Sequence, residues 1–342
     1  MRRRLLLIGP ITPPKGGVSV HIHRLSSLLG ADFAVSYLDE SRQIKPGIPN
    51  IRRMSPWRYL ACIGSADVVH VHSFSGGLKF VHVLCARMLL RRVVLTVHSV
   101  MQGGLASRLM FKLSTLFSHT VVAVSLEAGQ LVSGPSKIIP AFIPPSADEL
   151  IVGADVAEWI AAKKDEGRFV FASNAYRLER HQGVDLYGLD LIIDAFSISP
   201  ISRLCACIFI VGSPEFDPER LESLKKVIAQ RQIVHCFNLL DRPENFPGVV
   251  ALCDGTIRAT NTDGDALSVR ESIQLGKVTI ASDAAARPEG TRLFKSRDEQ
   301  SLVDAILAAI QRHTCGEAKA LGLSPYRDLY TSIYRGRDQA PA

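Results

Sequence analysis

One stretch of the chain has residue types and spacing that suit a phosphate ester. Positions 261–271 read NTDGDALSVRE, a loop with two acids and a glycine that opens into a predicted helix. Backbone N–H groups in the first turn of such a helix, and the positive end of its dipole, would face a phosphate. Three residues form that turn: Ala266, Leu267 and Ser268.

Two carboxylates flank this turn. Asp263 precedes the predicted helix, and Glu271 lies about 1.5 turns inside it. From these places the carboxylates could accept hydrogen bonds from sugar hydroxyls, as an acid does for ribose in dinucleotide-binding folds. An Asp-capped helix with one solvated Glu is the simpler alternative.

A pair of glycines, Gly16 and Gly17, follows the first apolar run of the chain. Glycine permits left-handed backbone and lets a substrate approach the N-terminus of the next helix. The spacing is not G-x-G-x-x-G, which disfavours a nicotinamide or flavin. A plain strand-to-helix turn is the alternative.

Three histidines fall at the ends of predicted strands. His70 and His72 alternate along one strand and point the same way, as metal ligands would, but no third ligand stands at a suitable spacing. We therefore expect no metal, and we expect His70 to be a hydrogen-bonded interior side chain. His98 ends an apolar strand, where residues that line a ligand site belong.

Short runs of Val, Ile and Leu alternate with helix-length segments along the chain, which predicts an α/β fold with parallel sheets. We expect two doubly wound, Rossmann-like domains facing across a cleft. They cover residues 1–150 and 165–320, and a last helix in 321–342 reaches back to the first domain. Expected strands are 5–9, 33–37, 68–72, 93–98, 120–125, 137–139, 168–173, 204–212, 233–237, 255–258 and 278–282.

Charge is unevenly distributed along the 342 residues. Residues 1–150 carry 17 basic and 7 acidic residues, whereas the remainder carries 23 basic and 26 acidic residues. The first half should therefore face something anionic. No nucleic-acid motif is present, so we expect a phosphate-bearing acceptor or a membrane surface.

Cysteines and hydropathy bear on the compartment. The seven cysteines are scattered without a C-x-x-C pair, and no apolar stretch reaches the ~18 residues of a membrane span. We expect a cytoplasmic protein, with peripheral contact to the inner face of the cytoplasmic membrane as an option.

The predicted helix 105–118 has an apolar stripe of its own. Leucines, Met110 and Phe117 fall on one side, and we expect this side to face the core. The alternative is that Phe111, between Arg108 and Lys112, docks on an anionic membrane.

These motifs together resemble those of glycosyltransferase family 4 and its GT-B relatives. The family signature has an acid, seven intervening residues and a Glu, then a helix that exits at a Gly-Lys pair. Asp263, Glu271 and the pair Gly276-Lys277 match these positions. This chain departs from the signature in having Asp for the usual first Glu and Ala266 for a usual Gly.

The resemblance implies a retaining enzyme that transfers a sugar from a nucleoside-diphosphate sugar to a glycan or a lipid-diphosphate-linked acceptor, as in bacterial surface-polysaccharide biosynthesis. It implies no cofactor and no metal. Arg177 would clamp the diphosphate together with Arg180 or Arg258, because Tyr187 stands where the family has a Lys.

The remaining roles implied by the resemblance concern the two ends of the transferred sugar. The 266–268 amides would bind phosphate and Glu271 the ribose, while His98 and Asp263 would hold the sugar. Gly16 and Gly17 would shape the acceptor side. Two rival functions stay open: a nucleotide-sugar epimerase, for which we identify no acid/base residues, and a non-catalytic nucleotide-sugar-binding module.

Overall fold

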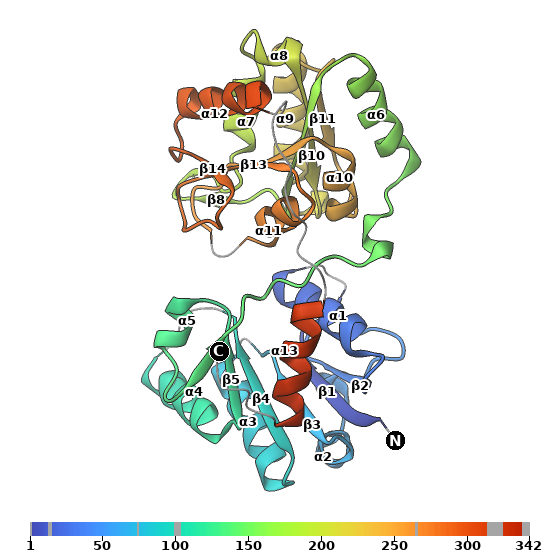
Figure 1. Ribbon diagram of the computed structural model, residues 1–342, viewed down its shortest axis with the longest axis vertical. Coiled ribbons are helices and arrows are strands. Elements are labelled where there is room, and N and C mark those ends of the chain that lie inside the picture. The colour runs from blue at the N-terminus through green and yellow to red at the C-terminus, as the bar shows by residue number, and fades with distance from the viewer. Residues whose placement is uncertain are drawn as a thin grey trace. The chain divides into compact units, whose positions relative to one another are not determined.

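The computed structural model describes residues 2–12, 16–73, 75–98, 104–263, 266–312 and 324–336. The chain divides into two compact units, one comprising Met1–Ile143 with Gly322–Ala342 and the other Pro144–Leu321. Each unit is an α/β layer structure around a parallel sheet (Figure 1).

The sheet of the first unit has the strand order β2-β1-β3-β4-β5-β6, and all neighbouring strands are parallel. The strands are β1 (Arg3–Gly9), β2 (Phe33–Asp39), β3 (Val68–Val71), β4 (Arg92–Val97), β5 (Thr120–Ala123) and β6 (Ser136–Ile138). The inner strands β3 and β4 are almost wholly buried, as their continuous Val and Leu runs predict.

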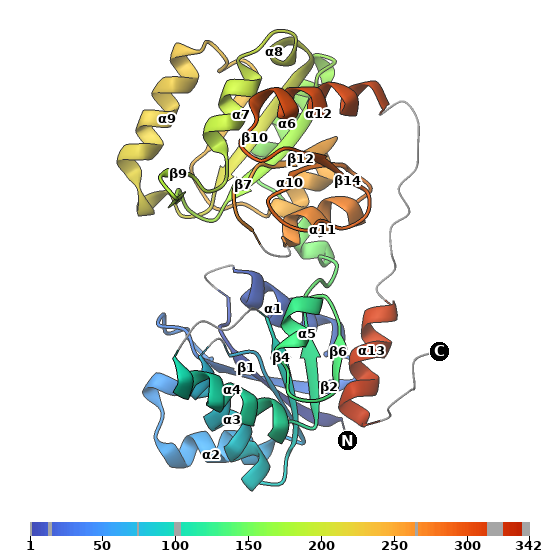
Figure 2. The same cartoon turned by 90° about the vertical axis from the view of Figure 1, so that its left-hand side faces the viewer.

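Helices cover both faces of this sheet (Figure 2). One core joins the sheet to α1 (Gly17–Leu29) and to the final helix α13 (Ser324–Arg335), which contributes the fully buried Tyr330 and Tyr334. A separate core on the other face takes side chains from four helices. These are α2 (Pro56–Ser65), α3 (Gly76–Met88), α4 (Leu105–Phe117) and α5 (Leu126–Gln130).

The sheet of the second unit has the order β11-β10-β7-β12-β13-β14 and is also parallel throughout. Its strands are β7 (Phe169–Ala175), β10 (Cys205–Val211), β11 (Phe237–Leu240), β12 (Gly255–Arg258), β13 (Val278–Ser282) and β14 (Thr291–Phe294). A small antiparallel pair, β8 (Arg180–His181) and β9 (Val184–Asp185), follows β7. Cys205 and Cys207, expected to share a strand, lie buried on β10 as free thiols.

Seven α-helices lie in the described part of the second unit. They are α6 (Ala154–Asp165), α7 (Leu189–Phe196), α8 (Ile201–Leu204), α9 (Pro218–Gln230), α10 (Phe246–Leu252), α11 (Leu267–Gln274) and α12 (Glu299–Arg312). Helix α10 contacts both α6 and α11, while α7, α8 and α12 contact one another, so the helices form two layers. Within the described ranges, none of the helices combines the length and apolar character needed to cross a bilayer.

The strand orders place a topological switch point in each unit. After β1 the chain adds β2 on one side and then β3 on the other, so the first switch lies between β1 and β3. The second lies between β7 and β12 for the same reason. Ligands of doubly wound sheets bind beyond the carboxyl ends of the strands at such points.

Two expectations from the sequence are wrong in detail. The segment 233–237 forms a turn in which Cys236 N–H donates to the Ile233 carbonyl, and strand β11 begins only at Phe237. The orientation of α4 is also reversed, since Phe111 is buried while Leu105 and Leu109 are exposed.

The reversed face of α4 has a local cause. Its core side consists of Phe111, Ser114 and Thr115. The two hydroxyls donate to the carbonyls of Met110 and Lys112 in their own helix, at 2.7 and 2.8 Å. Small, internally satisfied side chains can therefore face the core, which a pattern based on hydrophobicity alone does not reveal.

Candidate functional site

In the second unit, Asp263 is the centre of an ion-pair network beyond the end of β12. Its carboxylate accepts hydrogen bonds from Arg258 Nε and Nη2 at 3.0 and 3.3 Å, and from Thr260 Oγ1 at 3.1 Å. Arg287 Nη1 donates a further bond at 3.0 Å. Burial tends to raise the pKa of Asp263, but Arg258 and Arg287 outweigh burial and hold it below its ordinary value.

Arg287 is the buried support of this network. Its side chain is 2% exposed, and its guanidinium also donates to the Ser282 carbonyl at 3.1 Å and to Thr260 Oγ1 at 3.2 Å. Arg287 thus ties the end of β13 to the loop after β12. Nothing in the local sequence around Arg287 indicates that its side chain reaches Asp263.

Arg258 also lies over the ring of Tyr187, with its guanidinium carbon 5.1 Å from the ring centroid. Tyr187 stands at the position where the family resemblance calls for a Lys. The guanidinium of Arg258 therefore places a positive charge beside that position. The next residue, Gly188, has a φ of +69°, and a Cβ on it would lie 2.2 Å from the Ala259 carbonyl oxygen. The close approach of these two loops therefore requires glycine.

The other two predicted arginines lie after β7. Arg177 forms a two-pronged ion pair with Glu179 at 3.0 and 3.2 Å, and its guanidinium lies 4.3 Å from the centroid of the Phe216 ring. The hydrogen bonds that Arg177 donates to the Glu179 carboxylate raise the pKa of Arg177. Arg180 is exposed at the start of β8.

Helix α11 starts close to where the sequence places it. Ala266 is its N-cap and provides no side-chain cap, and no acid lies in its first turn. Leu267 and Ser268 open the helix, and Glu271, one turn further on, is buried at 5% exposure. The helix N-terminus is thus left to groups other than its own capping residue.

Near these loops, two buried amide oxygens have no hydrogen-bond partner among the residues that the structure describes. They belong to Asn174, at the end of β7, and to Asn261, in the loop after β12. Both strands flank the switch point of the second sheet. Unsatisfied buried acceptors are rare, and at a ligand site they indicate where donors of a ligand could bind.

In the first unit, four histidines gather at the carboxyl ends of β3 and β4 and on α1. The ring centroid of His21 lies 5.3 Å from that of His72 and 5.4 Å from that of His98. The ring centroids of His70 and His72 are 4.0 Å apart. His70 is hydrogen-bonded to Tyr334 Oη at 2.6 Å and Thr96 Oγ1 at 2.7 Å, so it is the satisfied interior side chain that the sequence predicts.

His98 is held by a second histidine, because its Nε2 lies 3.0 Å from His72 Nδ1. Burial lowers the pKa of both rings well below the ordinary value, and the neighbouring histidines lower it further. At this strand end, His72 Nε2 and Ser73 Oγ are buried and have no hydrogen-bond partner in the described part of the chain. Among the described residues, no cluster of three or more His, Cys, Asp or Glu side chains has the geometry of a metal site.

The glycine pair has a different basis from the one expected. Gly16 is the N-cap of α1 with a φ of −129°, which is not left-handed, and its N–H donates to Ser19 Oγ at 2.8 Å. A Cβ on Gly17 would meet nothing within 4 Å. With residues 13–15 outside the described ranges, the structure thus shows room beside Gly17 at the helix N-terminus.

The sequence did not indicate two contributors to the histidine cluster. His21 lies on α1, and its Nδ1 donates a hydrogen bond to the Ala141 carbonyl at 2.9 Å. Tyr334 comes from the last helix of the chain. Only the fold brings these distant residues together.

Comparisons with known proteins identify the fold. No family model and no curated protein matches the sequence. A glycosyltransferase structure from Rickettsia africae is similar with a TM-score of 0.72 at 14% identity, covering 99% of this chain and 100% of that chain. The Anabaena protein HepE in complex with UDP gives 0.69 at 14% identity, covering 97% and 98%.

A third structure extends the similarity. The trehalose-phosphate synthase of Burkholderia xenovorans in complex with glucose-6-phosphate gives a TM-score of 0.64 at 12% identity, covering 97% of this chain and 100% of that chain. The chain therefore has the GT-B fold of these glycosyltransferases, as the sequence predicts.

Proposed function

We propose that this protein is a retaining glycosyltransferase that moves a sugar from a nucleoside-diphosphate sugar to a hydroxyl of a glycan or lipid-linked acceptor. The pathway we propose is the biosynthesis of a polysaccharide such as O-antigen, capsule or exopolysaccharide. One observation carries the proposal: cations, a helix N-terminus whose N-cap residue Ala266 provides no side-chain cap, and a buried Glu all follow the two strands that flank the switch point of the second sheet. HepE has been solved with UDP-glucose, which makes a uridine donor the first to test.

Arg258 is our choice for the cation that replaces the family's Lys. It lies over Tyr187, whereas Arg180 is exposed on a separate hairpin. Arg177 would join Arg258 on the diphosphate, and the backbone N–H groups of 266–268 would donate hydrogen bonds to the phosphate oxygens. Developing charge on the leaving diphosphate would then be stabilised by fixed cations and dipoles.

The sugar end is assigned to Asp263 and His98. Both oxygens of Asp263 already accept hydrogen bonds from arginines, so its first effect is to orient Arg258 and Arg287. His98 is kept neutral by burial, and a neutral imidazole can hydrogen-bond a sugar hydroxyl without adding charge. Glu271 would bind the ribose, and the open space at Gly17 would admit the acceptor.

The experiment is a transfer assay with a panel of nucleotide sugars and of free and lipid-linked acceptors. We expect nucleotide release that depends on the acceptor, retention of the anomeric configuration in the product by NMR, and full activity in EDTA. Arg258→Lys should keep part of this activity and Arg258→Gln should lose most of it. Transfer that needs added metal, or that inverts the anomer, would contradict the proposal.

A non-catalytic binding module is the second candidate, favoured by one observation. Arg258 is already neutralised by Asp263, which weakens its pull on a diphosphate. The same panel distinguishes the two functions, because a module would bind a donor in calorimetry without turning it over. Isomerised donor without transfer would instead indicate an epimerase.

A further inference from the structure

The outward side of α4 is apolar. Leu105, Leu109 and Leu116 are 86%, 59% and 65% exposed. They recur at helical spacing, so they share one side of the helix with Arg108 and Lys112, which are also exposed. A helix that has already buried its other side against the core has no structural need for these leucines.

The apolar surface continues onto the neighbouring helix. Helices α3 and α4 pack against each other, and α3 turns Val81 and Met88 outward, with Met88 74% exposed. Single exposed apolar residues are ordinary, but adjacent helices that both present them form a patch of the kind found at interaction sites. We call this patch, with Arg108 and Lys112, the α3–α4 face.

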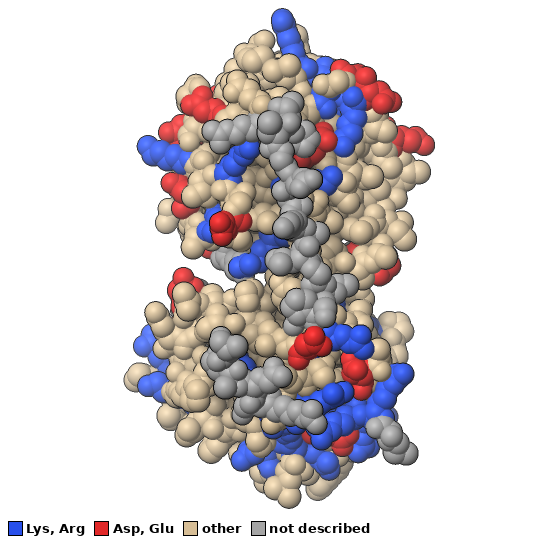
Figure 3. All heavy atoms as spheres, viewed as in Figure 1, with Lys and Arg blue, Asp and Glu red and all other residues tan. Residues whose placement is uncertain are grey.

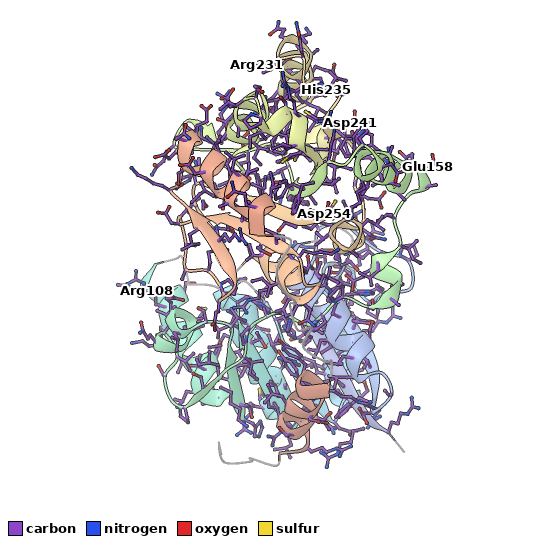
Figure 4. The ribbon with its side chains drawn as sticks, turned by 45° about the horizontal axis from the view of Figure 1, so that its top comes forward. Arg108, Glu158, Arg231, His235, Asp241 and Asp254 are labelled. Carbon is purple, nitrogen blue, oxygen red and sulfur yellow. The ribbon has the colours of Figure 1, made fainter. Side chains whose placement is uncertain are left out.

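The stretch of sequence that carries this face is strongly basic. Residues 41–126, which include all of α2, α3 and α4, contain 11 Lys and Arg but a single acid, Asp67. That acid is paired with Arg4 at 3.4 Å. Figure 3 shows blue cations among uncharged residues at the left-hand edge, over α4, and Figure 4 labels Arg108 at the outer edge of its unit.

We propose that the α3–α4 face docks on an anionic lipid bilayer. The leucines would enter the boundary between headgroups and acyl chains while Arg108 and Lys112 meet lipid phosphates. A second copy of the same face is a poorer partner, because it would bring like charges together without acids to neutralise them. A nucleic acid would leave the leucines in water.

This inference goes beyond the proposed function and does not depend on it, since no residue of the α3–α4 face belongs to the candidate site. It identifies the part of the chain that would hold an enzyme next to a lipid-linked acceptor. It also differs from the membrane contact that the sequence suggested, because Phe111 is buried and the exposed leucines take its place.

The test is co-sedimentation of the full chain with phosphatidylcholine vesicles that contain or lack phosphatidylglycerol. We expect binding only to the anionic vesicles. A cation near an anionic surface contributes about fivefold to partitioning, so Arg108→Gln with Lys112→Gln should weaken binding about 25-fold. Leu109→Ser with Leu116→Ser should weaken it at least about tenfold.

The matched control removes two exposed cations from the second unit, Arg203→Gln with Lys226→Gln, and should bind as the parent does. Transfer to a soluble acceptor should be unchanged in all three double variants, which separates this proposal from the proposed function. Equal binding to neutral vesicles, or equal loss in the control, would overturn the proposal. So would a dimer in ultracentrifugation that the leucine variant abolishes.

Discussion

Acidification from about pH 7.5 to about pH 5.5 should destabilise the protein through its buried histidines. Burial lowers the pKa of His21 to about 4 and those of His70, His72 and His98 well below the ordinary value. Unfolding returns each ring to a pKa of about 6.5, so the unfolded chain takes up protons that the folded chain refuses. Stability therefore falls as the pH falls below about 6.5.

The size of the effect follows from this linkage. Between pH 7.5 and 5.5, one histidine that stays neutral in the folded protein lowers the free energy of unfolding by about 1.4 kcal/mol, and four such histidines lower it by about 5.5 kcal/mol. Nearby cations act in the same direction, since Arg24 lies near His21 and Lys79 near His98. The loss of stability should level off only where the histidines also become protonated in the folded protein. For His21 this happens from about pH 4 downward, because its folded pKa is about 4.

Urea unfolding followed by circular dichroism in half-unit pH steps would measure this fall. Replacing His21 by Gln should reduce the pH slope by about a quarter. The same replacement at His23, which lies on α1 outside the cluster, would serve as the comparison for the substitution itself. A total fall smaller than about 1.5 kcal/mol would refute the reasoning.

Three substitutions test the second unit. Gly188→Ala should lower the free energy of unfolding by about 2 kcal/mol or more in thermal unfolding, because its Cβ would meet the Ala259 carbonyl. Gly183 has a φ of +82° but no described atom near its Cβ position, so Gly183→Ala should lower the free energy of unfolding less. Asp263→Asn should lower the free energy of unfolding by about 3–5 kcal/mol, because it leaves the charges of Arg258 and Arg287 uncompensated. Glu179→Gln breaks an ion pair whose side chains are more exposed, and an equal loss of stability for this variant would contradict the prediction. Glu271→Gln should raise the donor KM at least tenfold with little change in kcat; an unchanged KM would remove the ribose assignment.

The fold could be predicted from the sequence because the residue patterns that indicate strands and helices are local. Runs such as those of β12 and β13 were placed with their observed bounds, since buried parallel strands are short, continuous and rich in Val and Ile. Strand β11 was misplaced because Ile233 and Phe237 both lie in an apolar stretch, and only the turn between them decides where the strand begins.

The site was accessible only in part. The loop motif predicts Asp263 and Glu271 as candidates, and alternation along a strand predicts that His70 and His72 point the same way. The partners of these residues were not visible, because Arg287 reaches Asp263 from the end of another strand and His21 reaches His72 from another helix. Such contacts depend on sheet order, which no single segment of sequence encodes.

Helix α13 has a consequence for how the chain is made. Tyr330 and Tyr334 fill the interior of the first unit, and Tyr334 is bonded to His70, yet both leave the ribosome after the whole of Pro144–Leu321. The first unit therefore cannot complete its interior until the polypeptide of the second unit has been made. A chain that stops before α13 would lack both tyrosines, so His70 would lose a hydrogen-bond partner and the strands beneath the helix would stay exposed to water.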